Sequence, residues 1–582
     1  MRLIIKHYLS ILKERDELDA ILPDLLLAVG IIPISRPQVG PRQYGVDIAA
    51  VGDDPKDGIR KLFLFTVKHG DFGRSDWESG QQAVRPSINE ILDTYIPTHI
   101  DHEHLDLPRK IVVVAGGELK QDHKNTWANY TKKNAEKEQL EIAFWGGDQL
   151  APMIEEHLLN EQLLPAECRK LLHKSISFAG DPNYDLRDLY ALFDQLYQDV
   201  DGSETTRKRK CSKRIRSATL CLLVFSRWSE DEENLKQPFM ASERLVLKTW
   251  DFIRRHDLFD YQRVVQDFVY CRSLFHKACS ALFNKIQPHC AVQDGLFTSG
   301  GAMVEHPVRV FEFIGIISLI GMDQVYLAHM SDQSGDANQH ADNAAAICNT
   351  LMALINNNPI SSSPAFDSHA NEISMAFMLM VATGNQDYAA SWLDSLLEQI
   401  AFAFYTDAGY PIATDSHEDL LAMRMGRVEK PEKLKFCSTL LPILAEFCVV
   451  FDQLIGSKLY DKISEMSRTV FKELNFQIWH PNEDTENFLY NSNAGFRSGI
   501  CFNSISLPKS VEEFKQNIED AMSNSAGVDE FSCFDRGLPI LPHISSRHFR
   551  TPQIPNLWRN SLLMGNHEAE QEATPEEPAK TS

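Results

Sequence analysis

The sequence predicts an α/β domain at the N-terminus followed by a large, mainly α-helical region. Up to about residue 160, helical apolar spacing alternates with short strand-like runs, in the order helix, two or three strands, helix, strand, helix, strand, helix. This mixture is typical of a compact α/β domain. From about residue 161 the segments become long, amphipathic and helical, and strand-like alternation is nearly absent until about residue 475.

The elements of the N-terminal domain can be assigned in order. Residues 5–29 carry a broad apolar stripe at helical spacing, and Gly30 ends that helix. Two apolar runs, GVDIAAV and KLFLFTVK, flank the loop GDDPKDG, whose Gly, Asp and Pro suit a hairpin connection, so 44–71 is predicted to form a β-hairpin. The later expected elements are a helix from about Trp77 to Tyr95 with Asp76 or Ser75 as its N-cap, a strand at 109–117, a helix at 127–140, a strand at 141–147 and a helix at 148–159.

The composition is typical of a soluble globular protein with more than one core, since the 582 residues are 43% hydrophobic and 24% charged. The formal net charge of −23 provides no general attraction for nucleic acid, so such a contact would need a local basic surface or a partner protein. The 11 cysteines are scattered without a CxxC pair, which fits a reducing cytoplasm. We expect no signal peptide and no membrane partner, because the longest apolar runs, 311–321, 373–384 and 439–451, are too short to span a bilayer and are predicted to be buried helices.

The predicted hairpin places one carboxylate and one ammonium group on adjacent strands. Asp47 lies in the first run, and Lys68 closes the second. A charge at the end of a buried strand is unfavourable unless it has a partner or a function. Because side chains alternate along a strand, Thr66 is expected on the same face as Lys68. The hairpin is therefore the first place to look for chemistry.

The N-terminal 160 residues resemble the PD-(D/E)XK nuclease superfamily, in its restriction-endonuclease-like (type IV restriction) branch. The resemblance rests on the helix 5–29, on Gly45 and Asp47 as G-x-D on one strand, on Thr66, Val67 and Lys68 at the end of the next strand, and on the later strand–helix pairs. It covers a little over a quarter of the chain. It implies a restriction-endonuclease-like fold and cleavage of phosphodiester bonds.

The resemblance also implies a Mg²⁺ or Mn²⁺ site, because a divalent cation acidifies water and neutralises developing charge. Asp47 would be the first carboxylate ligand, with the Val67 carbonyl as a further ligand. Lys68 would hold the attacking water and help to deprotonate it. Family members carry Glu, Asp or often Gln where this chain has Thr66, and a hydroxyl is a weaker metal ligand than a carboxylate.

The departure at Thr66 leaves three possibilities open. A glutamate of the first helix, Glu17 or Glu14, would complete the site. Alternatively Glu78, Gln81 or Gln82 would approach from the second helix. In the third case, catalysis has been lost and the fold is kept for binding.

A basic run near the start of the helical region is a second candidate site. Its cations are Arg207, Lys208, Arg209, Lys210, Lys213, Arg214 and Arg216. The run would contact nucleic-acid phosphates in a strongly salt-dependent manner, or pair with acidic groups of this protein or of a partner protein. Cations at a helix N-terminus are electrostatically disfavoured, so we expect the run to have some partner.

These observations divide the chain into five predicted parts. They are the nuclease-like α/β domain at 1–160, a helical linker at 161–205, a helical sensor or assembly domain at 206–475, an irregular region packed on the helices at 476–562 and a disordered acidic tail at 563–582.

The expected function is metal-dependent cleavage of nucleic acid, with DNA favoured over RNA. The resemblance implies a setting in prokaryotic, antiviral defence, with regulation by the helical domain, by a protein partner or by a homo-oligomer. The alternative is a catalytically inactive nuclease-fold subunit that binds nucleic acid or protein in a larger assembly.

Overall fold

The computed structural model describes most of the chain, including nearly all of the predicted hairpin. The described residues are 5–6, 9, 18–35, 44–68, 70–78, 83–135, 140–158, 165–297, 304–331, 334–406, 411–428, 434–451, 453–491, 499–502, 505–523, 525 and 531–560.

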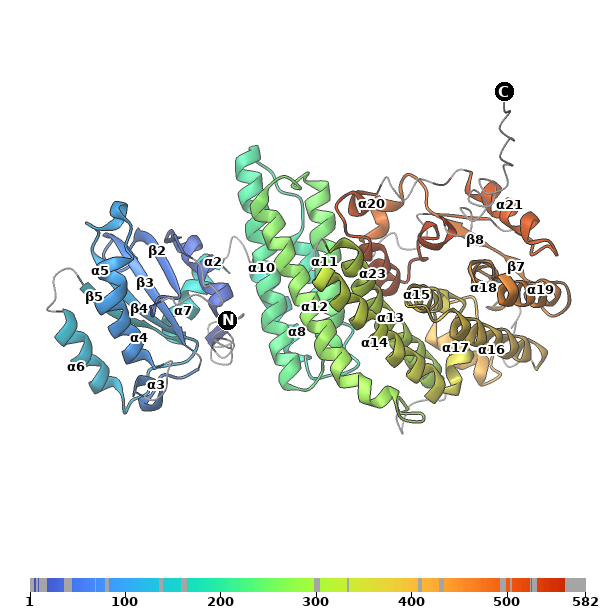
Figure 1. Cartoon of the computed structure of the whole chain (residues 1–582), viewed down its shortest axis with the longest axis horizontal. Helices are drawn as coiled ribbons and strands as arrows, with labels where there is room; N and C mark the ends of the chain where they lie inside the picture. The colour runs from blue at the N-terminus through green and yellow to red at the C-terminus, as the bar shows by residue number, and fades with distance from the viewer. Residues whose placement is uncertain are drawn as a thin grey trace, which may run out of the picture. The chain divides into compact units, whose positions relative to one another are not determined.

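The described structure is mostly helical, with a small mixed sheet near the N-terminus (Figure 1). At this level of detail it confirms the prediction of an α/β region followed by helices. The chain forms two compact units, the first comprising Met1–Ala241 and Leu258–Cys271 and the second Ser242–Asp257 and Arg272–Ser582. The five-part division stays a prediction, and the tail 563–582 lies outside the described residues.

A five-stranded sheet in the order β1-β2-β3-β4-β5 organises the N-terminal region. Its strands are β1 (Ile32–Pro33), β2 (Ile48–Asp53), β3 (Arg60–Lys68), β4 (Arg109–Ala115) and β5 (Leu140–Trp145). The first three strands pair antiparallel, and β3, β4 and β5 pair parallel. The predicted hairpin is confirmed as β2 and β3, with Ile48 opposite Phe65.

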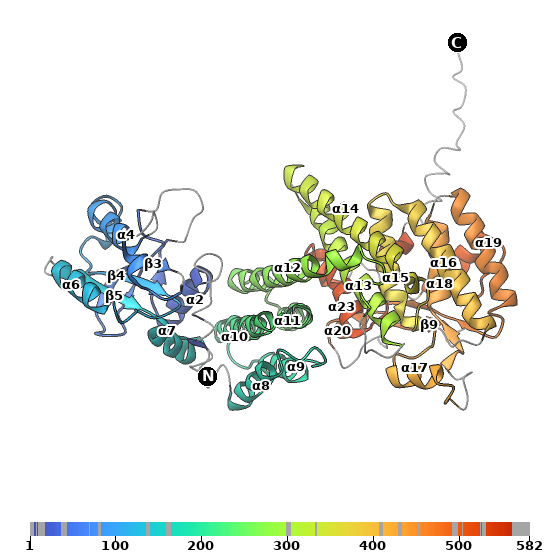
Figure 2. The same ribbon diagram turned by 90° about the horizontal axis from the view of Figure 1, so that it is seen from below.

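Helices cover both faces of the sheet. α4 (Val84–Glu90) and α6 (Lys124–Ala135) lie on one side, and α2 (Asp19–Val29) and α7 (Gly147–Met153) lie on the other (Figures 1 and 2). The α4 side has a core in which Leu62 and Leu64 of β3 pack in one cluster with Trp77 and Ile88. We call this the core face of the sheet.

The helix predicted from Trp77 to Tyr95 is divided. It consists of α3 (Arg74–Glu78), α4 and the π-helical turn η2 (Ile91–Tyr95), which continues into α5 (Ile96–Thr98). The start at Trp77 is wrong, because α3 begins at Arg74. Ser75 and Asp76 both lie inside α3, so neither is its N-cap; Asp76 accepts the Gly73 N–H at 2.9 Å from within the first turn.

The first unit continues with helices only. They are α8 (Ala166–Ser177), α9 (Arg187–Leu196) and α10 (Glu204–Asp231), and α10 packs against the other two. α11 (Lys236–Arg255) and α12 (Gln262–Cys290) have residues in both units.

The second unit has α13 (Glu305–Met330) in its core, packed against α14 (Ser334–Asn357), α15 (Ala370–Ala382) and α23 (Ile540–Phe549). The run 311–321 lies inside α13. The helix that contains this run has 26 residues and, by length and composition, is apolar enough to cross a membrane, so the apolar helix is longer than the run alone indicates. The burial prediction is confirmed, since 72% of its apolar window is buried inside the protein.

The second unit contains further helices and several short strands. They are α16 (Gln386–Tyr405), α17 (His417–Arg424), α18 (Leu440–Val450), α19 (Gln453–Thr469), α20 (Thr485–Leu489), α21 (Val511–Met522), α22 (Ser532–Asp535) and the strands β6 (Cys437–Ser438), β7 (Asn475–Phe476), β8 (Ile478–His480) and β9 (Ile500–Phe502). A 3₁₀ turn, η6 (Asp367–His369), precedes α15.

A buried ion pair fixes the last described segment to α18. The Arg559 guanidinium donates to the Glu446 carboxylate at 2.7 and 2.8 Å, and both residues are at most 1% exposed. Trp558 donates its indole N–H to the same carboxylate at 2.8 Å. The internal glutamate of the run 439–451 is therefore compensated inside the core.

Candidate active site

A tight turn delivers Asp47 to the start of β2. Tyr44 and Gly45 both have left-handed backbone conformations, with φ of 48° and 80°. A Cβ at Gly45 would lie 2.3 Å from the Ser87 carbonyl oxygen of α4, so only glycine fits against the helix. The chain then enters the ladder, where the Asp47 N–H donates to the Phe65 carbonyl at 2.8 Å.

Asp47 and the end of β3 are in direct contact. The Val67 N–H donates to Asp47 Oδ2 at 2.7 Å. The N–H and C=O of one strand residue point to the same side, so the Val67 carbonyl also faces the β2 side, beyond the last ladder pair of Ile48 with Phe65. The predicted neighbours Asp47, Val67 and Lys68 are thus brought together at one end of the hairpin.

Thr66 and Lys68 share the core face but differ in exposure. Alternation along β3 places both on the side of Leu62 and Leu64. Thr66 is 1% exposed, opposite Val113 of β4, whereas Lys68 ends the strand and is partly exposed. Within the described residues the Lys68 ammonium has no ion-pair or hydrogen-bond partner. Lys68 can therefore meet a solvent-borne ligand, while Thr66 is enclosed by the core.

Within the described residues, Asp47 belongs to no group of three acidic, histidine or cysteine side chains that could hold a metal ion. Glu17, Glu14, Gln81 and Gln82 lie outside the described residues. Glu78 is exposed and pairs with Arg85 at 2.8 Å. The structure therefore leaves Glu14 and Glu17 of the first helix, and Gln81 and Gln82, as the untested candidates for the ligand that Thr66 does not supply.

A different acidic group, Asp54, Asp57 and Glu141, has carboxylate oxygens close enough to hold a metal. Two ammonium groups already lie among these oxygens. Lys61 Nζ contacts Asp54 at 2.7 Å and Glu141 at 3.0 Å, and Lys110 Nζ contacts Asp54 at 2.7 Å. Burial raises the pKa of Asp54, but hydrogen bonds from Lys110 and Lys61 outweigh burial and lower it to about 2. We interpret this group as a buried ion-pair network, since the lysines supply the positive charge that a cation would bring.

This network is remote from the candidate site. Lys61 lies near the start of β3 and Lys68 at its end. Seven residues of strand separate them by roughly 23 Å. A metal ion bound at Asp54 and the Lys68 ammonium would therefore be too far apart to contact the same atom of a substrate.

The sequence interpretation missed two carboxylates at the carboxyl edge of the parallel strands. Asp71, three residues after β3, accepts the Glu118 N–H at 2.9 Å. Glu118, three residues after β4, accepts the Asp148 N–H at 2.7 Å and pairs with Lys6 at 3.1 Å. The sequence signal that could have found them is their position just after two predicted strands, because ligands of parallel sheets bind at the carboxyl ends of the strands.

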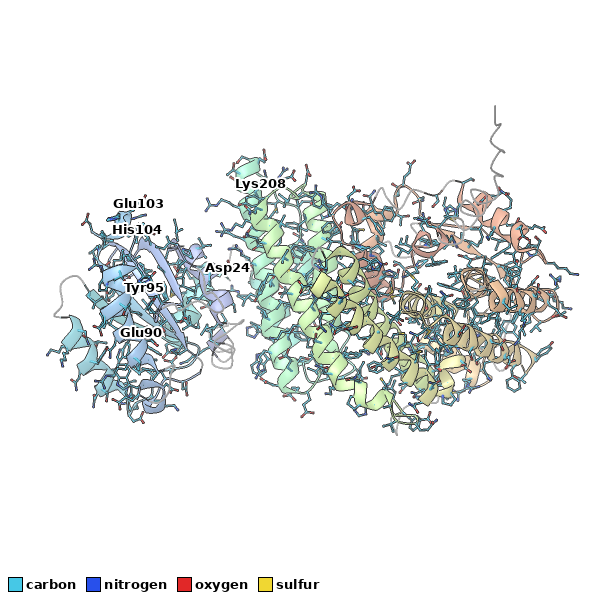
Figure 3. All side chains as sticks on the ribbon, in the orientation of Figure 1. Asp24, Glu90, Tyr95, Glu103, His104 and Lys208 are labelled. Atoms are coloured by element: carbon cyan, nitrogen blue, oxygen red, sulfur yellow. The ribbon has the colours of Figure 1, made fainter. Side chains whose placement is uncertain are left out.

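The cations of the basic run lie on α10, where Figure 3 labels Lys208, and they differ in their partners. Lys208 pairs with Glu204, Arg216 pairs with Asp267 at 2.8 Å and with Asp24 at 3.4 Å, and Lys210 and Arg214 donate to the backbone carbonyls of Asp201 and Gln198. Arg209 and Lys213 are exposed, Arg207 is partly exposed, and these three have no such partner within the described part of the chain. Internal partners therefore account for the other four cations, and Arg209 and Lys213, four residues apart, are left exposed on one helix face.

The donor set around Asp47 fits a hard divalent cation. A carboxylate and a backbone carbonyl on the same side of β3 are oxygen ligands of the kind Mg²⁺ and Mn²⁺ take, and water molecules usually complete their shells. Thr66 contributes no accessible oxygen to this set.

No family model, curated protein or solved structure matches this chain. The resemblance to the PD-(D/E)XK nucleases therefore stays a prediction that rests on the residues themselves.

Proposed function

We propose that the N-terminal domain is a metal-dependent phosphodiesterase of restriction-endonuclease-like fold, acting on DNA in preference to RNA. The observation that carries the proposal is the 2.7 Å hydrogen bond from the Val67 N–H to Asp47, which joins the first carboxylate to the strand end that bears Lys68. A defence role and regulation by the helical region, a partner or a second copy belong to the same proposal.

Each residue has a distinct part in the proposed site. Asp47 and the Val67 carbonyl would hold Mg²⁺ or Mn²⁺, together with Glu17 of the first helix. The bound cation would polarise the phosphodiester and acidify water. Lys68, which is partly exposed, would orient the attacking water and stabilise the hydroxide as its proton leaves.

The test is cleavage of duplex DNA, single-stranded DNA and RNA by the full-length protein with Mg²⁺ or Mn²⁺. We expect Asp47→Asn and Lys68→Gln to reduce the rate constant by about 100-fold or more, the size of a lost general acid–base or metal contact. Glu17→Gln and Glu14→Gln identify the helix glutamate. Lys56→Gln is the matched control, because Lys56 lies in the loop at the other end of the hairpin and is exposed; its rate should remain that of the wild type.

The buried position of Thr66 favours one second candidate, an inactive nuclease fold that binds nucleic acid. Binding of DNA without cleavage under every metal condition would support this candidate and contradict the proposal. Cleavage that survives both Asp47→Asn and Lys68→Gln would place the chemistry elsewhere.

A further inference from the structure

The second unit contains a cavity of about 260 Å³ that lies between segments far apart in the sequence. Its walls come from the turn η6 and the start of α15, from residues 413–415, from β6 and the start of α18, from β8 and β9, and from residues 550–559. Protein interiors are close-packed and have few voids larger than a water molecule, so a space of this size is a candidate ligand site.

Much of the wall is apolar, and two indole rings in it are held in place. Its large apolar members are Ile443, Ile478, Pro552, Pro555, Trp479 and Trp558. Trp558 stacks on Phe447 with ring centroids 5.6 Å apart. A Cβ at Gly499 would lie 2.2 Å from the Trp479 ring, so glycine leaves the room that this ring needs. Fixed aromatic rings offer faces and edges against which a further ring can pack.

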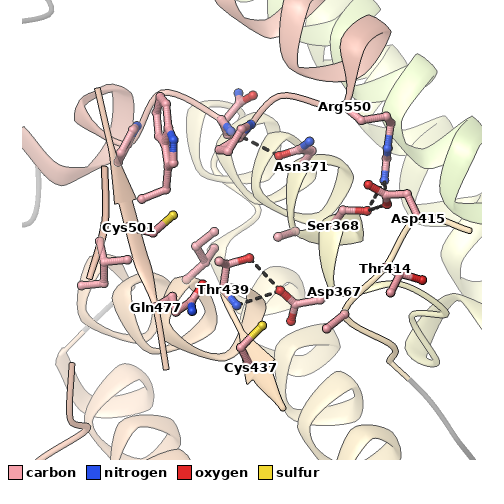
Figure 4. A pocket seen from close by; sticks show the side chains of 18 of the residues that line it. Asp367, Ser368, Asn371, Thr414, Asp415, Cys437, Thr439, Gln477, Cys501 and Arg550 are labelled. Carbon is pink, nitrogen blue, oxygen red and sulfur yellow. Dashed lines mark hydrogen bonds and ion pairs between the residues drawn. The ribbon is translucent and has the colours of Figure 1, made fainter. Parts of the chain in front are cut away.

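The arginines of the wall already have partners within the protein. Arg559 is held by Glu446, as described above. Arg550 pairs with the buried Glu372 and also lies 4.0 Å from the Asp415 carboxylate, which Figure 4 shows beside it. A charged ligand would have to displace one of these partners, which is unfavourable.

Asp367, the remaining charged residue of the wall, is also satisfied. It accepts the N–H groups of Thr439 and Leu440, the first amides of α18, at 2.7 and 3.3 Å. It also accepts the hydroxyls of Ser438 and Thr439 at 2.5 and 2.7 Å. Its carboxylate occupies the N-terminus of α18, so this helix end is not open to an anion. The charges of the wall therefore call for no charged ligand.

Two thiols line the cavity from different strands. Cys437 belongs to β6 and Cys501 to β9, and Figure 4 shows them on different walls. Cys437 is partly exposed and Cys501 is exposed, whereas the other cysteines of the chain are all buried. Burial raises the pKa of the Cys437 thiol to about 11, so this thiol is a weak nucleophile at neutral pH. The pair therefore serves as a local reporter of whatever fills the cavity.

We propose that this cavity binds an uncharged aromatic molecule of one ring or two fused rings. An apolar cavity of about 150 Å³ holds benzene, so the volume of about 260 Å³ has room for a two-ring molecule. The ligand ring packs against Trp479 and Trp558, and the isoleucines and prolines enclose it. This binding site is independent of the chemistry proposed at Asp47.

The first test is titration calorimetry of the full-length protein with indole. Tryptophol, tryptamine and indole-3-acetate add to the same ring a short side chain that is uncharged, cationic or anionic. We expect saturable binding of indole and tryptophol, and binding at least about tenfold weaker for the two charged probes, because a buried charge without a partner is unfavourable. Absence of saturable binding of indole, or a charged probe that binds as tightly as tryptophol, would overturn the proposal.

The second test locates the bound ligand in the wild-type protein. N-ethylmaleimide is applied to the native protein, and mass spectrometry measures the rate of modification at each cysteine. Because Cys437 and Cys501 are the cysteines that are not buried, we expect modification there, and saturating indole should slow it. Unchanged modification of both thiols at saturating indole would place the ligand elsewhere and contradict the proposal.

A pair of matched variants tests the cavity volume. Ala413→Leu adds volume to a partly exposed wall position and should abolish indole binding. Ala341→Leu makes the same change at an exposed position of α14 outside the cavity and should leave the affinity unchanged. Wild-type affinity in Ala413→Leu, or equal weakening by both variants, would speak against the site. Should Ala413→Leu fail to fold, the thiol measurement on the wild type decides.

Discussion

At the scale of single residues, Asp54 is the carboxylate that neutralises two buried lysines of the sheet. Its side chain is 1% exposed and lies 2.7 Å from the ammonium groups of both Lys61 and Lys110. Removing one member of a buried ion pair leaves the other charge without compensation. Asp54→Asn should therefore lower the free energy of unfolding by roughly 3 kcal/mol, measured by urea denaturation. Asp53→Asn, one residue earlier and exposed, should change it by less than about 0.5 kcal/mol.

The ionisation of Asp54 also makes the stability of the folded protein depend on pH in the acid range. The pKa of Asp54 falls from its ordinary value of 3.8 to about 2 in the folded protein. A depressed carboxylate pKa contributes stability that is complete above pH 3.8 and is lost as the pH falls toward 2. Circular dichroism as a function of pH should show this loss in the wild type, and the loss should be smaller in Asp54→Asn. Equal acid sensitivity of the two proteins would contradict the assignment.

The sequence could locate Asp47 and Lys68, because each stands beside an apolar run of recognisable period. It could not identify the Asp54 network, since its members lie 56 and 87 positions apart, at Asp54, Lys110 and Glu141, and only the register of the sheet joins them. Nor could it show that Thr66 is enclosed, because that depends on how α3 and α4 pack over β3. Burial of a strand residue is a tertiary property, whereas the strand itself is a local one.

At the scale of elements, α10 shows how one helix divides its cations between structure and solvent. Arg216 is fixed by Asp267, which also accepts the Ser212 hydroxyl at 2.6 Å. Arg209 and Lys213 lie four residues apart, on the same helix face. Among the described residues of the run, these two are exposed and lack an internal partner, so we propose that they are the cations available to a nucleic-acid backbone.

This division gives a prediction for DNA binding. The double variant Arg209→Gln/Lys213→Gln should reduce the slope of log K against log salt by about 2, with one released counterion for each lost phosphate contact. Fluorescence anisotropy on duplex DNA measures the slope. Arg216→Gln should leave the slope unchanged and destabilise the helix packing. An unaltered slope in the double variant would remove α10 from the interface.

Elements with a clear local period were the predictable ones. The hairpin, the strands β4 and β5 and the Gly30 cap of α2 follow from apolar spacing and from turn chemistry. The helix expected from Trp77 to Tyr95 is divided instead, and its first segment starts at Arg74. The apolar spacing could not fix where the helix begins, because Phe72, which precedes α3, and Trp77, which lies inside it, both pack in the same core.

At the scale of the whole molecule, α13 is the feature that composition alone would misplace. It passes the length and hydropathy test for a membrane span, yet 72% of its apolar window is buried. We expect the full-length protein to be extracted without detergent and to elute as a discrete species in size-exclusion chromatography. Extraction that requires detergent would show that α13 leaves its place in the core.

We propose that Asp47 and the end of β3 form a metal centre, and Mn²⁺ binding tests this proposal most directly. Free Mn²⁺ is measured by electron paramagnetic resonance during titration of the wild type, Asp47→Asn and Asp57→Asn. We expect a Mn²⁺ site in the wild type and in Asp57→Asn, where the Asp54 network is altered, and loss of that site in Asp47→Asn. Unchanged Mn²⁺ binding in Asp47→Asn, or loss of binding only in Asp57→Asn, would contradict it.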